Sequence, residues 1–179
     1  ASLFCSLGFS QKKSIYNKDW IDFNKNGKKD IYEDTHASIQ DRVQNLLSLM
    51  TLDEKTCQLA TLYGTGRVLV DSEPKPGWKN EIWKDGIANI DEQGNGVNDH
   101  NRKVAVSYPY AESIKNRQTI QRWFVEETRL GIPVDFTNEG IRGLCHDRAT
   151  MFPAQCGQGA TWNRNLIRKI AEVTASEAT

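Results

Sequence analysis

The sequence predicts an α/β fold in which short parallel strands alternate with helices. Residues 112–128 have the apolar spacing of a helix with one buried face, and residues 134–137 favour a strand. Two earlier apolar runs, residues 67–70 and 86–90, indicate two more buried strands, and a second long helix follows near the end of the chain. The order strand, strand, helix, strand, helix is typical of parallel crossover connections.

A carboxylate stands at the end of the third predicted strand. Gly131 can adopt the left-handed conformation that ends a helix, and Pro133 cannot continue a helix because it has no N–H. The strand that follows stops just before Glu139. Ligands of parallel α/β sheets bind at the carboxyl ends of the strands, so Glu139 is the first candidate for a functional side chain.

Length and charge limit the kinds of partner. A chain of 179 residues is long enough for one ordinary domain with a core. Lys+Arg and Asp+Glu both number 23, so nothing directs the molecule towards nucleic acid or an anionic membrane. No apolar run approaches the roughly 20 residues that a membrane-spanning helix requires. Cys145 and Cys156 could form a disulfide or remain two small buried thiols.

The start of the chain has the character of an export signal. Residues 1–10 are apolar or small, and the polar run Gln11-Lys12-Lys13 follows at once. This pattern predicts that residues 1–11 are the remnant of a signal peptide, and hence a periplasmic or secreted location. An ordinary N-terminal strand is the alternative.

Residues 12–36 are predicted to form an N-terminal segment around an EF-hand-like calcium loop at residues 22–33. In such a loop alternate side chains point their oxygens inwards, a glycine at position 6 makes the sharp turn, and a final carboxylate binds in bidentate fashion. The predicted ligands are Asp22, Asn24, Asn26, Lys28 (through its carbonyl), Asp30 and Glu33, around the turn at Gly27. The alternative is a polar turn that binds nothing.

Three helix starts follow from capping residues. Ser38 caps a helix whose apolar residues recur on one face up to Met50. Thr51 and Glu54 form a capping box that opens a second helix, which is expected to continue through Leu62. Asn163 caps the last helix. The side chains of that helix expected to be buried are Leu166, Ile167, Ile170 and Val173.

A long irregular stretch, residues 63–110, carries Trp78 and Trp83. Loops of this length are usually functional or disordered. The two indole rings could form a platform on which a sugar stacks, or they could anchor the loop to the core.

Several blocks of the sequence resemble glycoside hydrolase family 3. Residues 39–59, with Arg42-Val43, Leu46-Leu47 and Met50-Thr51-Leu52, resemble the opening of that family. Residues 127–133, 149–153 and 160–163 resemble further blocks of it in the same order. The calcium-like loop is similar to the lead-in of many bacterial members. Residues 37–179 are therefore expected to be the start of the family's barrel domain.

The resemblance implies a retaining β-glycosidase, commonly a β-glucosidase or β-xylosidase, built on a (β/α)8 TIM-type barrel that is incomplete in this chain. An acidic residue in the loop after a barrel strand binds hydroxyls of the sugar in that family, and Glu139 matches it. Arg142 stands where many members carry His, and Cys145 where some carry Arg. The substrate-binding residues expected from the resemblance are Glu139, Arg142, His146 and Arg148.

The chain is expected to contain no catalytic residue of its own. A retaining mechanism needs a nucleophile and an acid/base about 5 Å apart. In the family both come later in the sequence, so they are expected beyond Thr179, and this chain alone is expected to be inactive. Its partners are then the remainder of the same polypeptide and an oligosaccharide or an aryl or alkyl β-glycoside. The alternative function is that of a non-catalytic, calcium-stabilised carbohydrate-binding or docking module.

Overall fold

The computed structural model describes residues 14–70, 72–91, 110–146 and 148–179. The predicted signal remnant, residues 1–11, lies outside the described residues. The chain divides into two compact units, Ala1–Leu49 and Met50–Thr179.

The first unit contains the predicted calcium loop and helix α1, Ile39–Leu49. α1 begins where the sequence predicts, because Ser38 Oγ accepts a hydrogen bond of 3.1 Å from the Asp41 amide. The loop ends in a short 3₁₀ helix, Ile31–Glu33, whose Tyr32 is buried and stacks on Phe23 with 6.2 Å between ring centroids.

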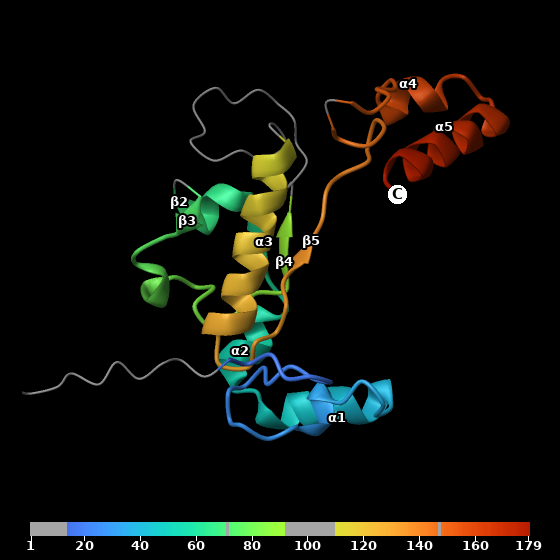
Figure 1. Cartoon of the computed structure of the whole chain (residues 1–179). Helices are drawn as coiled ribbons and strands as arrows, with labels where there is room; N and C mark the ends of the chain where they lie inside the picture. The colour runs from blue at the N-terminus through green and yellow to red at the C-terminus, as the bar shows by residue number, and fades with distance from the viewer. Residues whose placement is uncertain (1–13, 71, 92–109, 147) are drawn as a thin grey trace, which may run out of the picture. The chain divides into compact units, whose positions relative to one another are not determined.

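The second unit is built on a three-stranded parallel sheet. Its strands are β1, Thr61–Tyr63, β4, Asn89–Asp91, and β5, Asp135–Phe136, in the order β1-β4-β5. Figure 1 shows β4 and β5 side by side. Helix α3, Tyr110–Glu127, connects β4 to β5 in sequence. The predicted α/β class with parallel strands is therefore confirmed.

The structure corrects the predicted end of one helix and the predicted pairing of one strand. The second helix, α2, Leu52–Cys57, does not continue to Leu62, because the chain turns and enters β1 instead. The run at 67–70 contributes only β2, Leu69–Val70, which pairs antiparallel with β3, Glu73–Pro74, and not with the parallel sheet. A short apolar run fits the spacing of a helix as well as that of a strand. Pairing with residues distant in the sequence therefore decided the structure of both segments.

The core of the second unit lies between the sheet and α3. Its buried members are Leu62, Val68, Leu69, Trp83, Ile87, Ile90, Ile120, Trp123, Phe124 and Val134. Gln121 fixes α3 to the approach of β5, because its amide donates to the Val134 carbonyl and accepts from the Val134 amide, both at 2.9 Å. Such paired bonds hold the strand against the helix that precedes it.

The tryptophans of the irregular stretch belong to this core. Trp83 is 1% exposed and packs edge-on against Trp123, with 4.9 Å between centroids, and Trp78 packs against Trp123 at 4.5 Å. A buried ring cannot stack on a sugar, so the sugar-platform interpretation is wrong for Trp83. The alternative, that these rings anchor the loop, is confirmed.

An ion pair between a buried carboxylate and a half-exposed guanidinium joins the start of α2 to the turn before β5. Glu54 is 3% exposed and accepts hydrogen bonds of 2.8 Å from the Thr51 amide and from Arg129 Nε. Burial raises the pKa of Glu54, but the hydrogen bonds from Arg129 and Thr51 outweigh burial and hold that pKa below its usual value. The predicted capping box is present, and Arg129 gives it a partner that the sequence did not indicate.

The chain continues into helices α4, Gln155–Gly159, and α5, Arg164–Glu177. Asn163 caps α5 as predicted, because its Oδ1 accepts a hydrogen bond of 3.1 Å from the Leu166 amide. The predicted burial of the α5 stripe is wrong, since α5 has no buried residue. Periodicity shows which side chains share a face, but it does not show whether another element covers that face.

No described helix is both long enough and apolar enough to cross a membrane.

Candidate functional site

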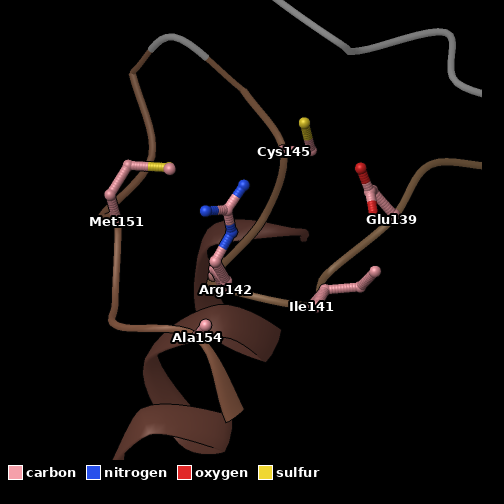
Figure 2. Close-up of a pocket in the computed structure, with 7 residues that line it drawn as sticks. Glu139, Ile141, Arg142, Cys145, Met151 and Ala154 are labelled. Atoms are coloured by element: carbon pink, nitrogen blue, oxygen red, sulfur yellow. The ribbon is translucent and has the colours of Figure 1, made fainter. Parts of the chain in front are cut away.

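Glu139 lies just beyond the carboxyl end of β5, at the edge of the parallel sheet where the sequence places it. It lines a cavity of about 280 Å³ formed by the loop that leaves the strand (Figure 2). The other lining residues are Ile141, Arg142, Gly143, Cys145, Met151 and Ala154. The loop after β5 thus places the Glu139 carboxylate at a concave surface.

The loop around the cavity is held by its own backbone. The Cys145 amide donates to the Glu139 carbonyl at 2.9 Å, and Asn138 Nδ2 donates to the Cys145 carbonyl at 2.7 Å. Gly143 has φ +92°, and a Cβ at this position would lie 2.0 Å from the Thr150 carbonyl oxygen. Only glycine fits there, so the loop shape depends on this position.

Two charged side chains of opposite sign line the cavity. Figure 2 shows the Arg142 guanidinium directed into the space near Cys145 and Met151, with the Glu139 carboxylate on the far side of Cys145. In the part of the chain that the structure describes, neither Glu139 nor Arg142 forms an ion pair. A carboxylate accepts hydrogen bonds and a guanidinium donates them, so together they can bind the hydroxyls of a sugar.

The remaining two predicted substrate residues gather elsewhere. The His146 ring stacks on Tyr110, with 5.7 Å between centroids, and the Arg148 guanidinium lies 5.3 Å from the centre of the same ring. Neither residue lines the cavity at Glu139. The structure therefore places Glu139 and Arg142 in one group and His146 and Arg148 in another, around the first turn of α3.

No disulfide joins the two cysteines near this region of the described chain. Cys145 is half-buried in the cavity wall, and Cys156 is exposed on α4. They do not form the disulfide that the sequence left open.

Sequence reasoning missed a polar group at the same sheet edge. Asp91, the last residue of β4, accepts a hydrogen bond of 2.7 Å from the Thr137 hydroxyl, and Asn89 Oδ1 lies 3.1 Å from the same oxygen. The signal that could have found Asp91 is a carboxylate directly after the apolar run at 86–90.

The predicted calcium loop has its carboxylates turned towards the loop backbone. Asp22 accepts from the Asn26 amide at 3.0 Å and from the Gly27 amide at 2.8 Å. Glu33, 2% exposed, accepts from the Asn24 amide at 3.3 Å and from the Asp30 amide at 2.9 Å. Both ends of the loop are thus closed by buried carboxylates.

Within the loop, Asp30 accepts hydrogen bonds from two side-chain amides. Asn24 Nδ2 donates to Asp30 Oδ2 at 2.6 Å, and Asn26 Nδ2 donates to the same oxygen at 2.7 Å. Gly27 makes the sharp turn with φ +77°. No three His, Cys, Asp or Glu side chains are grouped for metal binding among the described residues, so a cation here would depend also on amide and carbonyl oxygens.

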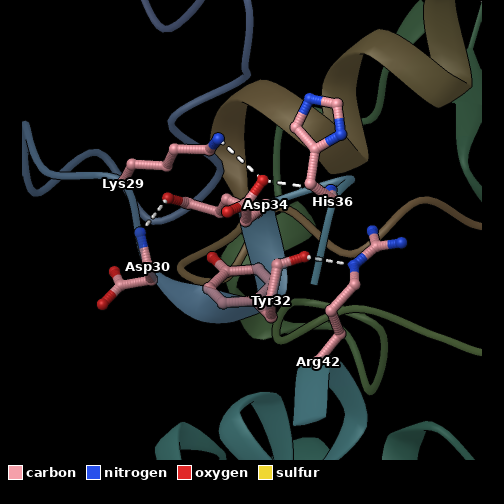
Figure 3. A network of polar contacts seen from close by, with 7 residues as sticks. Lys29, Asp30, Tyr32, Asp34, His36 and Arg42 are labelled. Atoms are coloured by element: carbon pink, nitrogen blue, oxygen red, sulfur yellow. Dashed lines mark hydrogen bonds and ion pairs between the residues drawn. The ribbon is translucent and has the colours of Figure 1, made fainter. Parts of the chain in front are cut away.

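A polar network links the loop to α1 (Figure 3). Lys29 Nζ lies 2.7 Å from Asp34 Oδ1, and the Tyr32 carbonyl accepts from Arg42 Nε at 3.1 Å. Burial raises the pKa of the Tyr32 phenol above its ordinary value, and the nearby carboxylates, first that of Glu33, raise it further. The carboxylates of Glu33, Asp30 and Asp22 thus lie close enough to the Tyr32 phenol to act on its pKa.

Comparison with known proteins agrees with the resemblance. Residues 51–179 match the Glycosyl hydrolase family 3 N terminal domain. The chain is also similar to a protein of Formosa agariphila named "Putative beta-xylosidase", with 28% identity over 152 residues. That similarity covers 82% of this chain and 18% of the relative, so the chain spans less than a fifth of the relative's length. Because the family match covers well over half of its residues, the chain belongs to glycoside hydrolase family 3.

Proposed function

We propose that this chain supplies part of the sugar-binding subsite of a retaining β-glycosidase that hydrolyses β-linked xylosides or glucosides. The observation that carries the proposal is the position of Glu139, in a cavity at the carboxyl edge of a parallel sheet. The family match and the name of the relative support the same substrate class. The three parallel strands are proposed to belong to a (β/α)8 barrel.

Glu139 has the chemistry that binding of a neutral sugar needs. An ionised carboxylate accepts hydrogen bonds at both oxygens, and each bond from a sugar hydroxyl to it is charge-assisted. The Arg142 guanidinium lines the same cavity and donates hydrogen bonds, so it can bind the oxygen atoms of sugar hydroxyls. The two residues bind and orient the ring. The nucleophile and the acid/base are proposed to come from the remainder of the polypeptide, and this chain alone is proposed to be inactive.

The proposal is tested by Glu139→Gln in the polypeptide that carries this chain, assayed with 4-nitrophenyl β-xyloside and β-glucoside. Loss of one or two charge-assisted hydrogen bonds should lower kcat/KM about 10- to 100-fold. Glu112→Gln is the matched control, because Glu112 is an exposed carboxylate in the first turn of α3 and does not line the cavity. Equal kcat/KM for wild type and Glu139→Gln would refute the role of Glu139.

The same assay tests the alternative function. A non-catalytic calcium-stabilised carbohydrate-binding or docking module would bind oligosaccharide or a second protein, and the full polypeptide would hydrolyse neither glycoside. Hydrolysis that depends on Glu139 would exclude that alternative.

We also propose that the loop at residues 22–33 binds Ca²⁺ as a structural ion. The side chains of Asp22, Asn24, Asn26, Asp30 and Glu33 and the carbonyl of Lys28 would hold it. The donor set fits a hard cation, because it offers three carboxylates. The side-chain nitrogens of Asn24 and Asn26 now contact Asp30, and rotation of these two amides would turn their oxygens inwards instead. A periplasmic or secreted location, which stays a prediction, would suit a site of this kind.

Calcium binding is tested by thermal unfolding of the chain in 1 mM CaCl₂ and in excess EGTA. Calcium should raise Tm of the wild type and have little effect on Asp22→Asn, whose carboxylate is lost from the first ligand position. Asp19→Asn, an exposed carboxylate outside the loop, is the control and should respond like the wild type. An equal Tm with calcium and with EGTA for the wild type would refute the site.

A further inference from the structure

The parallel sheet has one apolar face and one polar face. Leu62, Ile90 and Phe136 contribute to the core on one side. Side chains of a strand alternate between faces, and the three strands are in parallel register, so the neighbours of these residues share the opposite face. The members of this polar face are Thr61, Tyr63, Asn89, Asp91, Asp135 and Thr137. Such a face is suited to water or a polar ligand rather than to apolar packing.

At the carboxyl edge of the polar face a hydroxyl joins β5 to β4. The Thr137 hydroxyl lies 2.7 Å from Asp91 Oδ1 and 3.1 Å from Asn89 Oδ1. One hydroxyl has one proton, and the shorter contact is to a charged acceptor, so Thr137 donates to Asp91. Asn89 Oδ1 faces the same hydroxyl at 3.1 Å as a second, more distant acceptor. The three side chains meet at the Thr137 hydroxyl.

These contacts lie where the backbone pairing of the two strands stops. The Thr137 amide donates to the Ile90 carbonyl at 3.2 Å, and the chain leaves the sheet after it towards Glu139. Two residues span at most about 7 Å, so the place of Thr137 limits where the Glu139 carboxylate can lie. A side-chain bond at this point fixes the direction in which the loop departs.

We propose that Thr137 and Asp91 are positioning residues for Glu139, which hold the end of β5 against β4 so that the carboxylate meets the sugar in a defined place. This inference rests on the proposed function of Glu139 and adds two residues that do not line the cavity at Glu139. Thr137 is exposed, so its hydrogen bond to Asp91 contributes little to global stability and acts on the local geometry of the strand end.

The test compares Thr137→Val and Thr137→Ser in the full polypeptide, assayed with 4-nitrophenyl β-xyloside and by thermal unfolding. Valine keeps the branched shape and removes the hydroxyl, whereas serine keeps the hydroxyl. We expect Thr137→Val to lower kcat/KM about 3- to 10-fold with Tm unchanged, and Thr137→Ser to restore kcat/KM to near the wild-type value. Asp91→Ala should resemble Thr137→Val.

Asp135→Asn is the matched control, because Asp135 lies on the same face of the same strand. Among the described residues its carboxylate accepts only from the neighbouring Phe136 amide, at 2.9 Å. It should leave kcat/KM unchanged. A lower Tm with unchanged kcat/KM in Thr137→Val and Asp91→Ala would show a purely structural bond and overturn the inference. If Glu139→Gln is also without effect, the proposed function fails first. If Glu139→Gln lowers kcat/KM and both positioning variants do not, only the inference fails.

Discussion

Replacing Glu54 with glutamine keeps the size of the side chain and removes its charge at a buried position. Glu54 accepts from the Thr51 amide and from two nitrogens of Arg129, and it is 3% exposed. Glutamine offers one acceptor oxygen where the carboxylate offers two, so at least one of these donors loses its partner. The Arg129 side chain is half exposed, and water can solvate part of what is lost.

These contacts set the size of the effect. Loss of a hydrogen bond to a charged group costs about 1.5–3 kcal/mol, and loss of the reciprocal capping bond adds about 0.5–1 kcal/mol. Discounted for the exposure of Arg129, the free energy of unfolding should fall by about 2 kcal/mol. For a chain of this size that corresponds to a decrease in Tm of about 4–8 °C.

The assay is thermal unfolding of wild type and Glu54→Gln, followed by circular dichroism from pH 7 to pH 4. The folded-state pKa of Glu54 is lowered, so its contribution is complete above the pKa of the unfolded state and is lost as pH falls through the folded value. The difference in Tm should therefore be constant above about pH 5.5 and shrink below about pH 4.5.

Asp53→Asn is the control, because Asp53 is an exposed carboxylate in the same first turn of α2. It should change the free energy of unfolding by less than about 0.5 kcal/mol. An unchanged Tm for Glu54→Gln at pH 7, or a difference in Tm that stays the same down to pH 4, would refute the reasoning.

Three further predictions concern the frame that carries the site. Gly143→Ala should destabilise the cavity loop and weaken substrate binding, because the new Cβ would meet the Thr150 carbonyl. Sugar titration and hydrogen exchange of the loop amides measure the two effects. Exchange rates equal to those of the wild type would contradict the prediction. Gln121→Leu should lower the free energy of unfolding by about 2–4 kcal/mol, because both hydrogen bonds to Val134 are lost. Urea unfolding measures this, with Gln121→Glu, which keeps an acceptor, for comparison. Trp83→Ala should cost about 3–5 kcal/mol by the same measurement, and a value near zero would show that the ring does not anchor the core.

The sequence predicted the features of this chain that depend on neighbours a few residues away. The caps at Ser38, Thr51 and Asn163 are present because a capping side chain bonds to amides two or three residues further on. Gly131 takes a positive φ after α3, and β5 follows it as predicted. Glu139 could be placed at a sheet edge because the helix, the break and the strand before it have clear local signals.

What lies far apart in the sequence was decided only by tertiary structure. β1 is only three residues long and forms a strand because it pairs with β4. No local sequence pattern predicts that pairing. Arg129 meets Glu54 across 75 positions because the fold brings the start of α2 to the turn before β5. Thr137 meets Asp91 across 46 positions because the parallel register of β4 and β5 brings the strand ends together. Capping and periodicity are local properties that one segment carries by itself. Register, burial of a helix face and contact between strand ends are properties of pairs of segments, so they exist only once the chain has folded.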